Sequence, residues 1–129
     1  MRHTLPNFTI VSAYRKELSA NANMTRHLEA LQFLRNASIP HKEVYGYYEG
    51  DGERSILIVG AGCNAVADTL RARYEQDCYL YVNQDRDAEL RGLERGQAIG
   101  KWQETNKEDA MMADGFTVDP DTGKYYVCK

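Results

Sequence analysis

A short segment near the middle of the chain gathers phenol and carboxyl groups. Three tyrosines and three acids fall within nine residues: Tyr45, Tyr47, Tyr48, Glu49, Asp51 and Glu53. Phenol hydroxyls donate and accept hydrogen bonds and carboxylates attract cations, so such a group can bind a cationic substrate or orient a carboxyl group. Tyrosine is also common in strands and acids are common in turns, so structural roles for the same residues stay open.

A second set of polar residues surrounds the junction between the first predicted strand and the helix that follows it. These residues are Ser12, Tyr14, Arg15, Asn23, Arg26 and His27. The first turn of a helix presents free backbone N–H groups and favours an anion there. On an exposed helix face, Arg26 and His27 would instead be ordinary solvated side chains.

The sequence contains no motif for nucleophilic or metal catalysis. A Ser-His-Asp order, HExxH and GxxxxGK[ST] do not occur, and Cys63, Cys78 and Cys128 have neither CxxC spacing nor an even number. We therefore expect an enzyme without metal or cofactor. Its substrate would then carry its own nucleophile and leaving group.

A glycine motif at residues 56–65 suggests a different chemistry. It places GxGxxA between a predicted strand and a predicted helix, as in dinucleotide-binding proteins. A Rossmann unit begins with this strand, however, whereas here a hairpin precedes it and only 45 residues follow Gln84. We interpret the glycines as easing a tight turn, and an NAD-dependent reductase remains an alternative.

Hydrophobic periodicity predicts six elements in the order β-α-β-β-α-β. Alternating residues indicate strands, while the spacing of Met24, Leu28, Leu31 and Leu34 or Arg35 indicates an amphipathic helix that ends before Pro40. This order is typical of the ferredoxin-like α+β sandwich, in which two helices cover one face of an antiparallel sheet. The predicted elements are strand 8–14, helix 21–36, strands 43–48 and 54–59 joined by turn 49–53, a helix carrying Val66, Leu70 and Tyr74, and strand 78–83.

The pattern changes after Gln84. Residues 85–95 are densely charged and predict a solvated short helix or loop, whereas 98–104, 116–118 and 124–127 predict a C-terminal β extension. A chain of 129 residues has the size of one domain. We expect a single domain over 1–129, with its core at 7–84 and the extension at 97–128.

Charge and hydropathy disfavour two classes of partner. A net charge of −3 does not suit a protein that neutralises nucleic-acid phosphates. No apolar run has the length of a signal peptide or a membrane span. We expect a soluble, cytoplasmic protein that binds neither nucleic acid nor membrane.

Several short motifs, in this order along most of the chain, resemble the small S-adenosylmethionine (SAM) lyases of bacteriophages, long called SAM hydrolases. The motifs are VSAYR at 11–15 with Leu18, NMTRH at 23–27, GYY at 46–48, Glu53 before an apolar strand, EQDC at 75–78 with Gln84, GKWQE at 100–104, and GFTVD at 115–119 before Gly123.

The resemblance implies a reaction and an assembly. It implies a trimer of ferredoxin-like, PII-like subunits that bind SAM at their interfaces. The substrate's α-carboxylate attacks its own γ-carbon, expels methylthioadenosine and leaves homoserine lactone. The implied role is counter-defence by SAM depletion in the cytoplasm of an infected bacterial host. The alternative is a PII-like regulatory module that binds an adenine nucleotide without catalysis.

The resemblance also implies site residues. The family relies on a tyrosine and a glutamate near the second and third strands, and Tyr48 and Glu53 match them. We assign Glu53 to the cationic end of SAM and the Tyr48 hydroxyl to positioning the reacting group, although Tyr47 or Glu49 could replace either. Further contacts to substrate or to a neighbouring subunit are implied for Ser12, Asn23, Arg26, His27, Gln76, Gln84 and Glu104.

Overall fold

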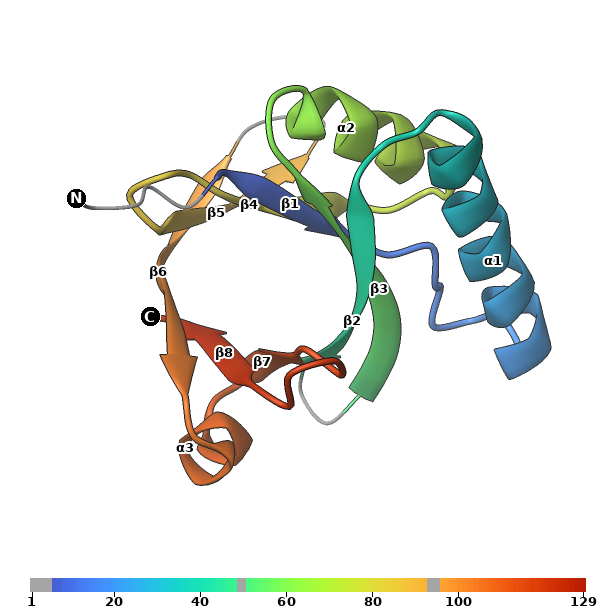
Figure 1. Ribbon diagram of the computed structural model, residues 1–129. Coiled ribbons are helices and arrows are strands. Elements are labelled where there is room, and N and C mark those ends of the chain that lie inside the picture. The colour runs from blue at the N-terminus through green and yellow to red at the C-terminus, as the bar shows by residue number, and fades with distance from the viewer. Residues whose placement is uncertain (1–5, 49–50, 93–95) are drawn as a thin grey trace.

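A computed structural model describes residues 6–48, 51–92 and 96–129 (Figure 1). These residues form eight strands and three helices joined by short connections. In chain order they are β1 (Phe8–Val11), α1 (Ala20–Asn36), β2 (His41–Tyr48), β3 (Asp51–Val59), α2 (Cys63–Arg73), β4 (Cys78–Val82), β5 (Asp87–Gly92), β6 (Gln97–Thr105), α3 (Lys107–Met112), β7 (Gly115–Val118) and β8 (Tyr125–Cys128).

The strands form a closed antiparallel barrel in the order β1-β3-β2-β7-β8-β6-β5-β4, in which β4 pairs with β1 (Figure 1). The expected ferredoxin-like, PII-like sandwich is therefore wrong, although the first six elements follow each other as predicted. Such a sandwich would leave β2 and β4 as free edges, whereas here β2 pairs with β7 and β4 pairs with β5. Closure satisfies the backbone groups that an edge strand leaves unpaired.

The charged segment 85–95 contains a barrel strand, so the prediction of a solvated helix or loop is also wrong. In β5 the small and apolar Ala88 and Leu90 alternate with the charged Asp87 and Glu89, which is the pattern of a strand with one buried face. The strands predicted in the C-terminal extension are present. They complete the wall of the barrel and are not an appendage to it.

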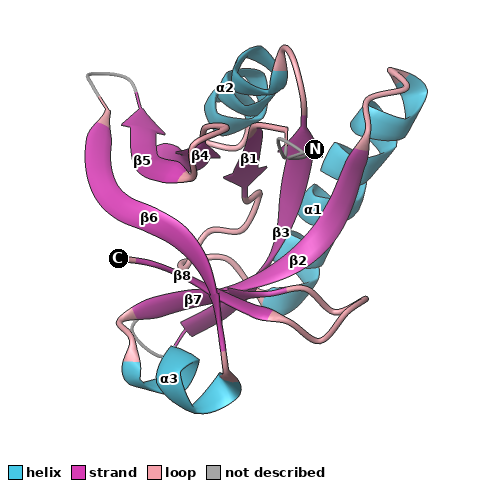
Figure 2. Cartoon of the chain, turned by 60° about the vertical axis from the view of Figure 1, so that its left-hand side comes forward, coloured by secondary structure: helices cyan, strands magenta, loops and turns pink. Residues whose placement is uncertain are grey.

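Two hydrophobic cores lie on opposite sides of the wall. α1 and α2 cover the outer face of the wall at β1 and β3 (Figures 1 and 2). The outer core beneath them includes Val11, Leu31, Leu34, Ile56, Ile58, Ala67 and Leu70. The inner core fills part of the barrel with Phe8, Val82 and Ala88, against which Leu57, Val59, Leu80 and Trp102 pack.

The buried face of α1 differs from the predicted one. Leu28 is 51% exposed, and the buried residues are Asn23, His27, Ala30, Leu31 and Leu34. The apolar stripe is therefore rotated, and two polar side chains occupy interior positions on the helix. Burial of a polar group is costly unless the group forms hydrogen bonds; Asn23 forms them, and His27 forms one through Nε2.

The glycine motif makes a tight strand-to-helix turn, as interpreted. Gly60 and Gly62 have φ values of +91° and +83°, in the left-handed region that favours glycine, and the Cys63 N–H donates to the Gly60 carbonyl at 3.2 Å. The strand before this turn is part of the barrel, so the parallel sheet of a Rossmann unit is not formed.

Candidate functional site

One row of residues crosses five strands on a single face of the wall. Glu53 of β3 is opposite Gly46 of β2, Gly46 is opposite Thr117 of β7, Thr117 is opposite Tyr126 of β8, and Tyr126 is opposite Glu104 of β6. Directly opposite residues of an antiparallel pair project to the same face. The register therefore places two acids predicted as site residues, Glu53 and Glu104, at the two ends of one row.

This row faces the inside of the barrel. Trp102 is two residues from Glu104 on β6 and shares its face, and its ring meets the Phe8 ring edge-on with 5.0 Å between centroids. β1 and β6 are not neighbours in the sheet, so this contact spans the interior. Trp102 also stacks on Tyr126, with centroids 4.8 Å apart.

Glu53 lies at the end of the row in a poorly solvated environment. Burial raises the pKa of Glu53 above its usual range, a hydrogen bond from the Ser12 hydroxyl opposes the rise, and the nearby charge of Asp51 adds to it. Ser12 is held in place because its oxygen accepts the Tyr14 N–H at 3.0 Å. No ion pair to Glu53 forms within the described ranges.

Tyr48 and Tyr47 project to opposite faces. Tyr48 is two residues from Gly46, shares its inner face, and is 66% exposed at the rim of the barrel. Tyr47 lies on the outer face, where its ring stacks on Phe116 at 4.7 Å. The register therefore favours Tyr48 for a role inside the barrel. The other alternative, Glu49, lies outside the described residues.

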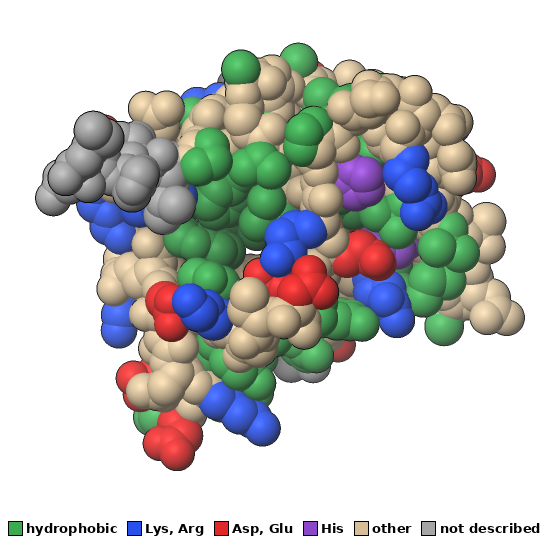
Figure 3. Space-filling view, in the orientation of Figure 1, with side chains coloured by type: hydrophobic (Ala, Val, Ile, Leu, Met, Phe, Trp, Pro, Cys, Tyr) green, Lys and Arg blue, Asp and Glu red, His purple; other side chains and the backbone are tan. Residues whose placement is uncertain are grey.

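The interior is apolar at one end and polar at the other. Figure 3 shows a hollow in the face seen in Figure 1, with hydrophobic side chains around it and acidic and basic side chains beside it. At the opposite end of β2 from Tyr48, Lys42 pairs with Asp119 and Asp121 of the β7–β8 turn at 2.5 and 3.5 Å. These ion pairs tie β2 to the turn that follows its neighbour β7. Burial raises the pKa of Asp119, but the hydrogen bond and charge of Lys42 help to bring the pKa below its ordinary value.

Asn23 has a structural role and does not face the interior of the barrel. It is buried, its Oδ1 accepts the Arg15 N–H at 2.8 Å, and its Nδ2 donates to the Arg15 carbonyl at 3.0 Å. These bonds fix the loop between β1 and α1. The side chain is fully used by the protein itself.

Arg26 and Gln76 tie the same loop to the segment after α2. Arg26 Nε donates to the Ala13 carbonyl at 2.7 Å, and its guanidinium lies over the Tyr74 ring at 5.1 Å. Gln76 Nε2 donates to the carbonyls of Tyr14 and Tyr74 at 2.8 and 3.1 Å. Both residues therefore support the backbone that carries Ser12.

His27 is fully buried under α1, on the outer side of the wall. Its Nε2 lies 2.7 Å from Glu43 Oε1, and the Tyr14 ring meets its ring edge-on at 6.1 Å. Its Nδ1 has no hydrogen-bond partner among the described residues. The wall separates His27 from Glu53.

The last two predicted contacts differ from each other. Gln84 is exposed in the turn between β4 and β5. This turn is next to the first residue of β1, whereas Ser12 follows the last residue of β1. Glu104 belongs to the inner row and lies 3.6 Å from Lys124. Tyr126 and Thr117 are inner-row residues that sequence reasoning missed, because only the pairing of β7 with β2 reveals them.

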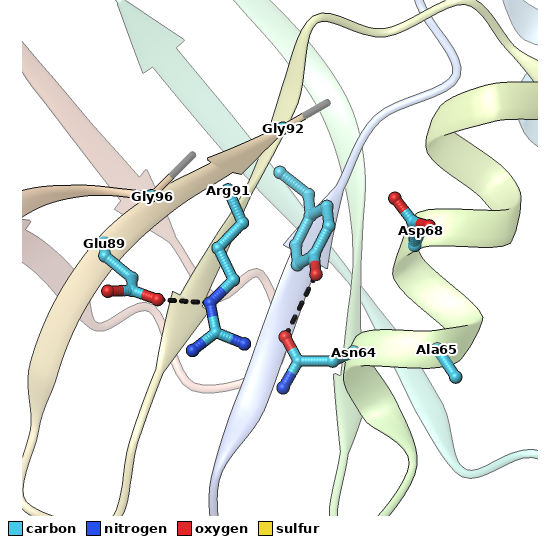
Figure 4. Close-up of a pocket in the computed structure, with 8 residues that line it drawn as sticks. Asn64, Ala65, Asp68, Glu89, Arg91, Gly92 and Gly96 are labelled. Atoms are coloured by element: carbon cyan, nitrogen blue, oxygen red, sulfur yellow. Dashed lines mark hydrogen bonds and ion pairs between the residues drawn. The ribbon is translucent and has the colours of Figure 1, made fainter. Parts of the chain in front are cut away.

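A second depression lies on the outside, between α2 and β5 (Figure 4). Tyr79 donates its hydroxyl to Asn64 Oδ1 at 3.1 Å, and Arg91 pairs with Glu89. Asp68 at its border pairs with Arg71 at 2.9 Å. Because these charges already pair with one another and no predicted site residue lines the depression, we take the barrel interior as the candidate site.

Comparison with known protein families identifies the family of this chain. The sequence model of the S-Adenosylmethionine lyase family matches residues 9–129, which include all eleven described elements except the first residue of β1. No curated protein matches the sequence. Within the described ranges, no helix is both long enough and apolar enough to cross a membrane.

Proposed function

This chain belongs to the S-Adenosylmethionine lyase family and is a lyase that acts on SAM, and from that premise we propose that the barrel interior binds SAM and that the substrate reacts with itself. An oxygen of its α-carboxylate forms a bond to its γ-carbon while the bond from that carbon to sulfur breaks. The bonding pair moves to sulfur and cancels the sulfonium charge. The products are 5′-methylthioadenosine and L-homoserine lactone, and no proton has to move.

The environment of Glu53 carries this proposal. It is an acid on the inner wall whose charge is disfavoured by burial and which has no ion-pair partner in the described part of the chain. A bound cation would compensate for this desolvation. In our proposal, Glu53 binds the cationic end of SAM and the Tyr48 hydroxyl positions the reacting methionyl group.

Catalysis of this kind depends on orientation. The nucleophile and the leaving group are parts of one flexible chain, so the protein must hold the carboxylate in line with the carbon–sulfur bond and limit the access of water. The inner core supplies an apolar surface for this purpose, with Phe8, Leu57, Leu80 and Trp102 among its side chains.

We further propose that the chain forms a homotrimer whose sites are completed at subunit interfaces, and that SAM depletion serves phage counter-defence. The exposure of Tyr48 at the rim supports the first point, because it leaves an aromatic surface that a second subunit can cover. The second point rests on the resemblance to phage enzymes. Size-exclusion chromatography with light scattering tests the trimer.

The decisive experiment incubates purified protein with SAM and EDTA in water enriched in ¹⁸O and follows the products by chromatography and mass spectrometry. We expect methylthioadenosine and homoserine lactone without ¹⁸O. Homoserine with ¹⁸O in its hydroxyl group would instead show attack by water on the γ-carbon. Label in the carboxyl group alone would come from later opening of the lactone. SAM that stays intact for hours would contradict the proposed function.

A further inference from the structure

We propose that Tyr126, with Trp102 stacked on it and Glu104 opposite it, binds the sulfonium of SAM and makes the site selective for a positively charged sulfur. This inference rests on the proposed function and adds a specificity determinant to it. In the reaction described above, Trp102 contributes only apolar surface and Tyr126 has no assigned role. The arrangement of the two rings and the charges around them indicate that they bind the sulfonium.

The two rings form part of a continuous aromatic wall inside the barrel. Trp102 and Tyr126 stack with an interplanar angle of 14°, and Trp102 meets Phe8 at 75°. Tyr126 is therefore at the end of this wall. Its next neighbour in the row is Thr117, a small side chain. A ligand that lies in the row would contact the ring of Tyr126.

Several aromatic rings elsewhere in the chain already have an arginine side chain over one face. Arg26 lies over Tyr74, Arg54 over Tyr45 and Arg91 over Tyr81 on the outside, and Arg86 lies over Phe8. Across the described ranges, no Lys or Arg lies over Trp102 or Tyr126. These inner rings are therefore available to a cation from outside the chain.

Glu104 adds negative charge beside the Tyr126 ring. It is directly opposite Tyr126, and its partner Lys124 is 3.6 Å away. Both members of that pair are more than half exposed, so solvent screens their attraction. A sulfonium at the ring would thus gain both the quadrupole of the phenol and a nearby carboxylate.

The middle of the inner row, between Glu53 and Glu104, leaves room for a ligand. Thr117 and Gly46 lie between Tyr126 and Glu53, and neither carries a large side chain. Three strand spacings separate Tyr126 from Glu53, roughly 14 Å along the curved wall. SAM carries two positive groups, so Glu53 can bind its ammonium while Tyr126 binds its sulfonium.

This arrangement would favour release of the product. Cleavage converts the sulfonium into a neutral thioether, which keeps the adenosine but loses its attraction to Tyr126 and Glu104. Methylthioadenosine would therefore compete weakly with SAM. A site that recognised only adenosine would bind both.

Two unreactive ligands test the charge selectivity without turnover. Sinefungin carries a protonated amine in place of the sulfonium, and S-adenosylhomocysteine carries a neutral thioether on the same adenosine and amino-acid frame. Isothermal titration calorimetry gives both dissociation constants for the wild type, Tyr126→Phe, Tyr126→Leu and Glu104→Gln. Tyr125→Leu is the control, because Tyr125 is on the same strand but faces outward, 5.9 Å from Phe116.

We expect Tyr126→Leu to weaken sinefungin about 3- to 30-fold, as loss of a cation–π contact should, and S-adenosylhomocysteine less than about twofold. Tyr126→Phe should keep most of the preference, and Glu104→Gln should reduce it. Equal weakening of both ligands by Tyr126→Leu, or none in a folded variant, would overturn the inference. The separate turnover assay decides the proposed function, so the two can fail independently.

Discussion

Ser12 and Glu53 meet inside the barrel, the first just after β1 and the second near the start of β3. The Ser12 oxygen accepts the Tyr14 N–H at 3.0 Å, and its hydroxyl proton is thereby free to bond the Glu53 carboxylate. One residue was expected to bind substrate and the other to act in the reaction. Their contact makes Ser12 a positioning residue for Glu53 and gives the pair a measurable signature in pH dependence.

Replacing Glu53 should abolish most activity while leaving the fold intact. In Glu53→Gln we expect kcat/KM for SAM to fall about 100-fold or more, as when a charged group aimed at the reacting centre is lost. Burial raises the pKa of Glu53 in the folded protein, so folding favours the protonated carboxyl. The protonated carboxyl therefore contributes to stability at low pH, and this contribution is lost as pH rises through the raised pKa. The melting temperature of Glu53→Gln at neutral pH should therefore equal or exceed that of the wild type.

Product formation by chromatography and thermal unfolding by circular dichroism check both parts of that prediction. Glu108→Gln, on the exposed surface of α3, is the matched control and should keep full activity. Wild-type turnover in Glu53→Gln would remove Glu53 from the site.

Loss of the Ser12 hydroxyl should shift the acid side of the pH–rate profile. The hydrogen bond favours ionised Glu53 and lowers its pKa, so Ser12→Ala should raise that pKa further. If SAM needs the carboxylate, kcat/KM falls as pH drops through this pKa, and the fall should begin at higher pH in Ser12→Ala. The two profiles should converge at higher pH. Ser12→Thr keeps a hydroxyl and should restore the wild-type profile; identical profiles for Ala and wild type would disprove the positioning role.

The two adjacent tyrosines should respond differently to loss of the hydroxyl. Tyr48→Phe removes a group on the inner face and should lower kcat by roughly tenfold or more, the effect of one hydrogen bond to a charged partner. Tyr47→Phe removes a group on the outer face, where the ring stacks on Phe116, and should change kcat less than about twofold. Steady-state kinetics separates the two. The reverse result would assign the role to Tyr47.

A larger side chain at Gly46, in the middle of the inner row, should block the site without destabilising β2. A Cβ at Gly46 would lie 3.6 Å from Ser55 Oγ, an ordinary contact, and valine suits a strand better than glycine. We expect Gly46→Val to melt at or above the wild-type temperature while kcat/KM for SAM falls at least about tenfold. A stable variant with full activity would place SAM elsewhere.

Asn23 should prove necessary for stability and not for chemistry. Asn23→Ala leaves the N–H and carbonyl of Arg15 without their buried partner, which costs about 1–3 kcal/mol of unfolding free energy. Urea denaturation measures the loss, and activity per folded molecule should stay near that of the wild type. Unchanged stability together with weakened SAM binding would restore Asn23 as a substrate contact.

The first six elements were predictable because their patterns are local. The apolar run at 56–59 is a local signal of the strand predicted at 54–59, and β3 includes these residues and pairs with both β1 and β2. Closure of the barrel was not predictable in this way. The high charge of 85–95 concealed the alternation of Ala88 and Leu90, and a pairing such as β2 with β7 joins segments whose contact no local pattern records.

The site was predictable in part. Tyr48 and Glu53 came from the family resemblance, and strand register places both on the inner face. The polar residues of α1 were misleading, because Asn23 and His27 at the start of a helix suggest an exposed binding surface. Both are buried, with their hydrogen bonds directed to the loop after β1 and to Glu43. Tyr126 and Thr117 needed the three-dimensional pairing of β7 and β8.

The position of β8 between β6 and β7 has a consequence for biosynthesis. Until β8 leaves the ribosome, β7 can pair only with β2, and β6 only with β5. The nascent sheet is then an open ribbon with β6 at one edge and β7 at the other. Glu53, Gly46 and Thr117 lie near one edge, and Glu104 lies at the other. β8 follows the other seven described strands in the chain and joins the two edges, so the row of inner residues can be completed only after β8 has been translated.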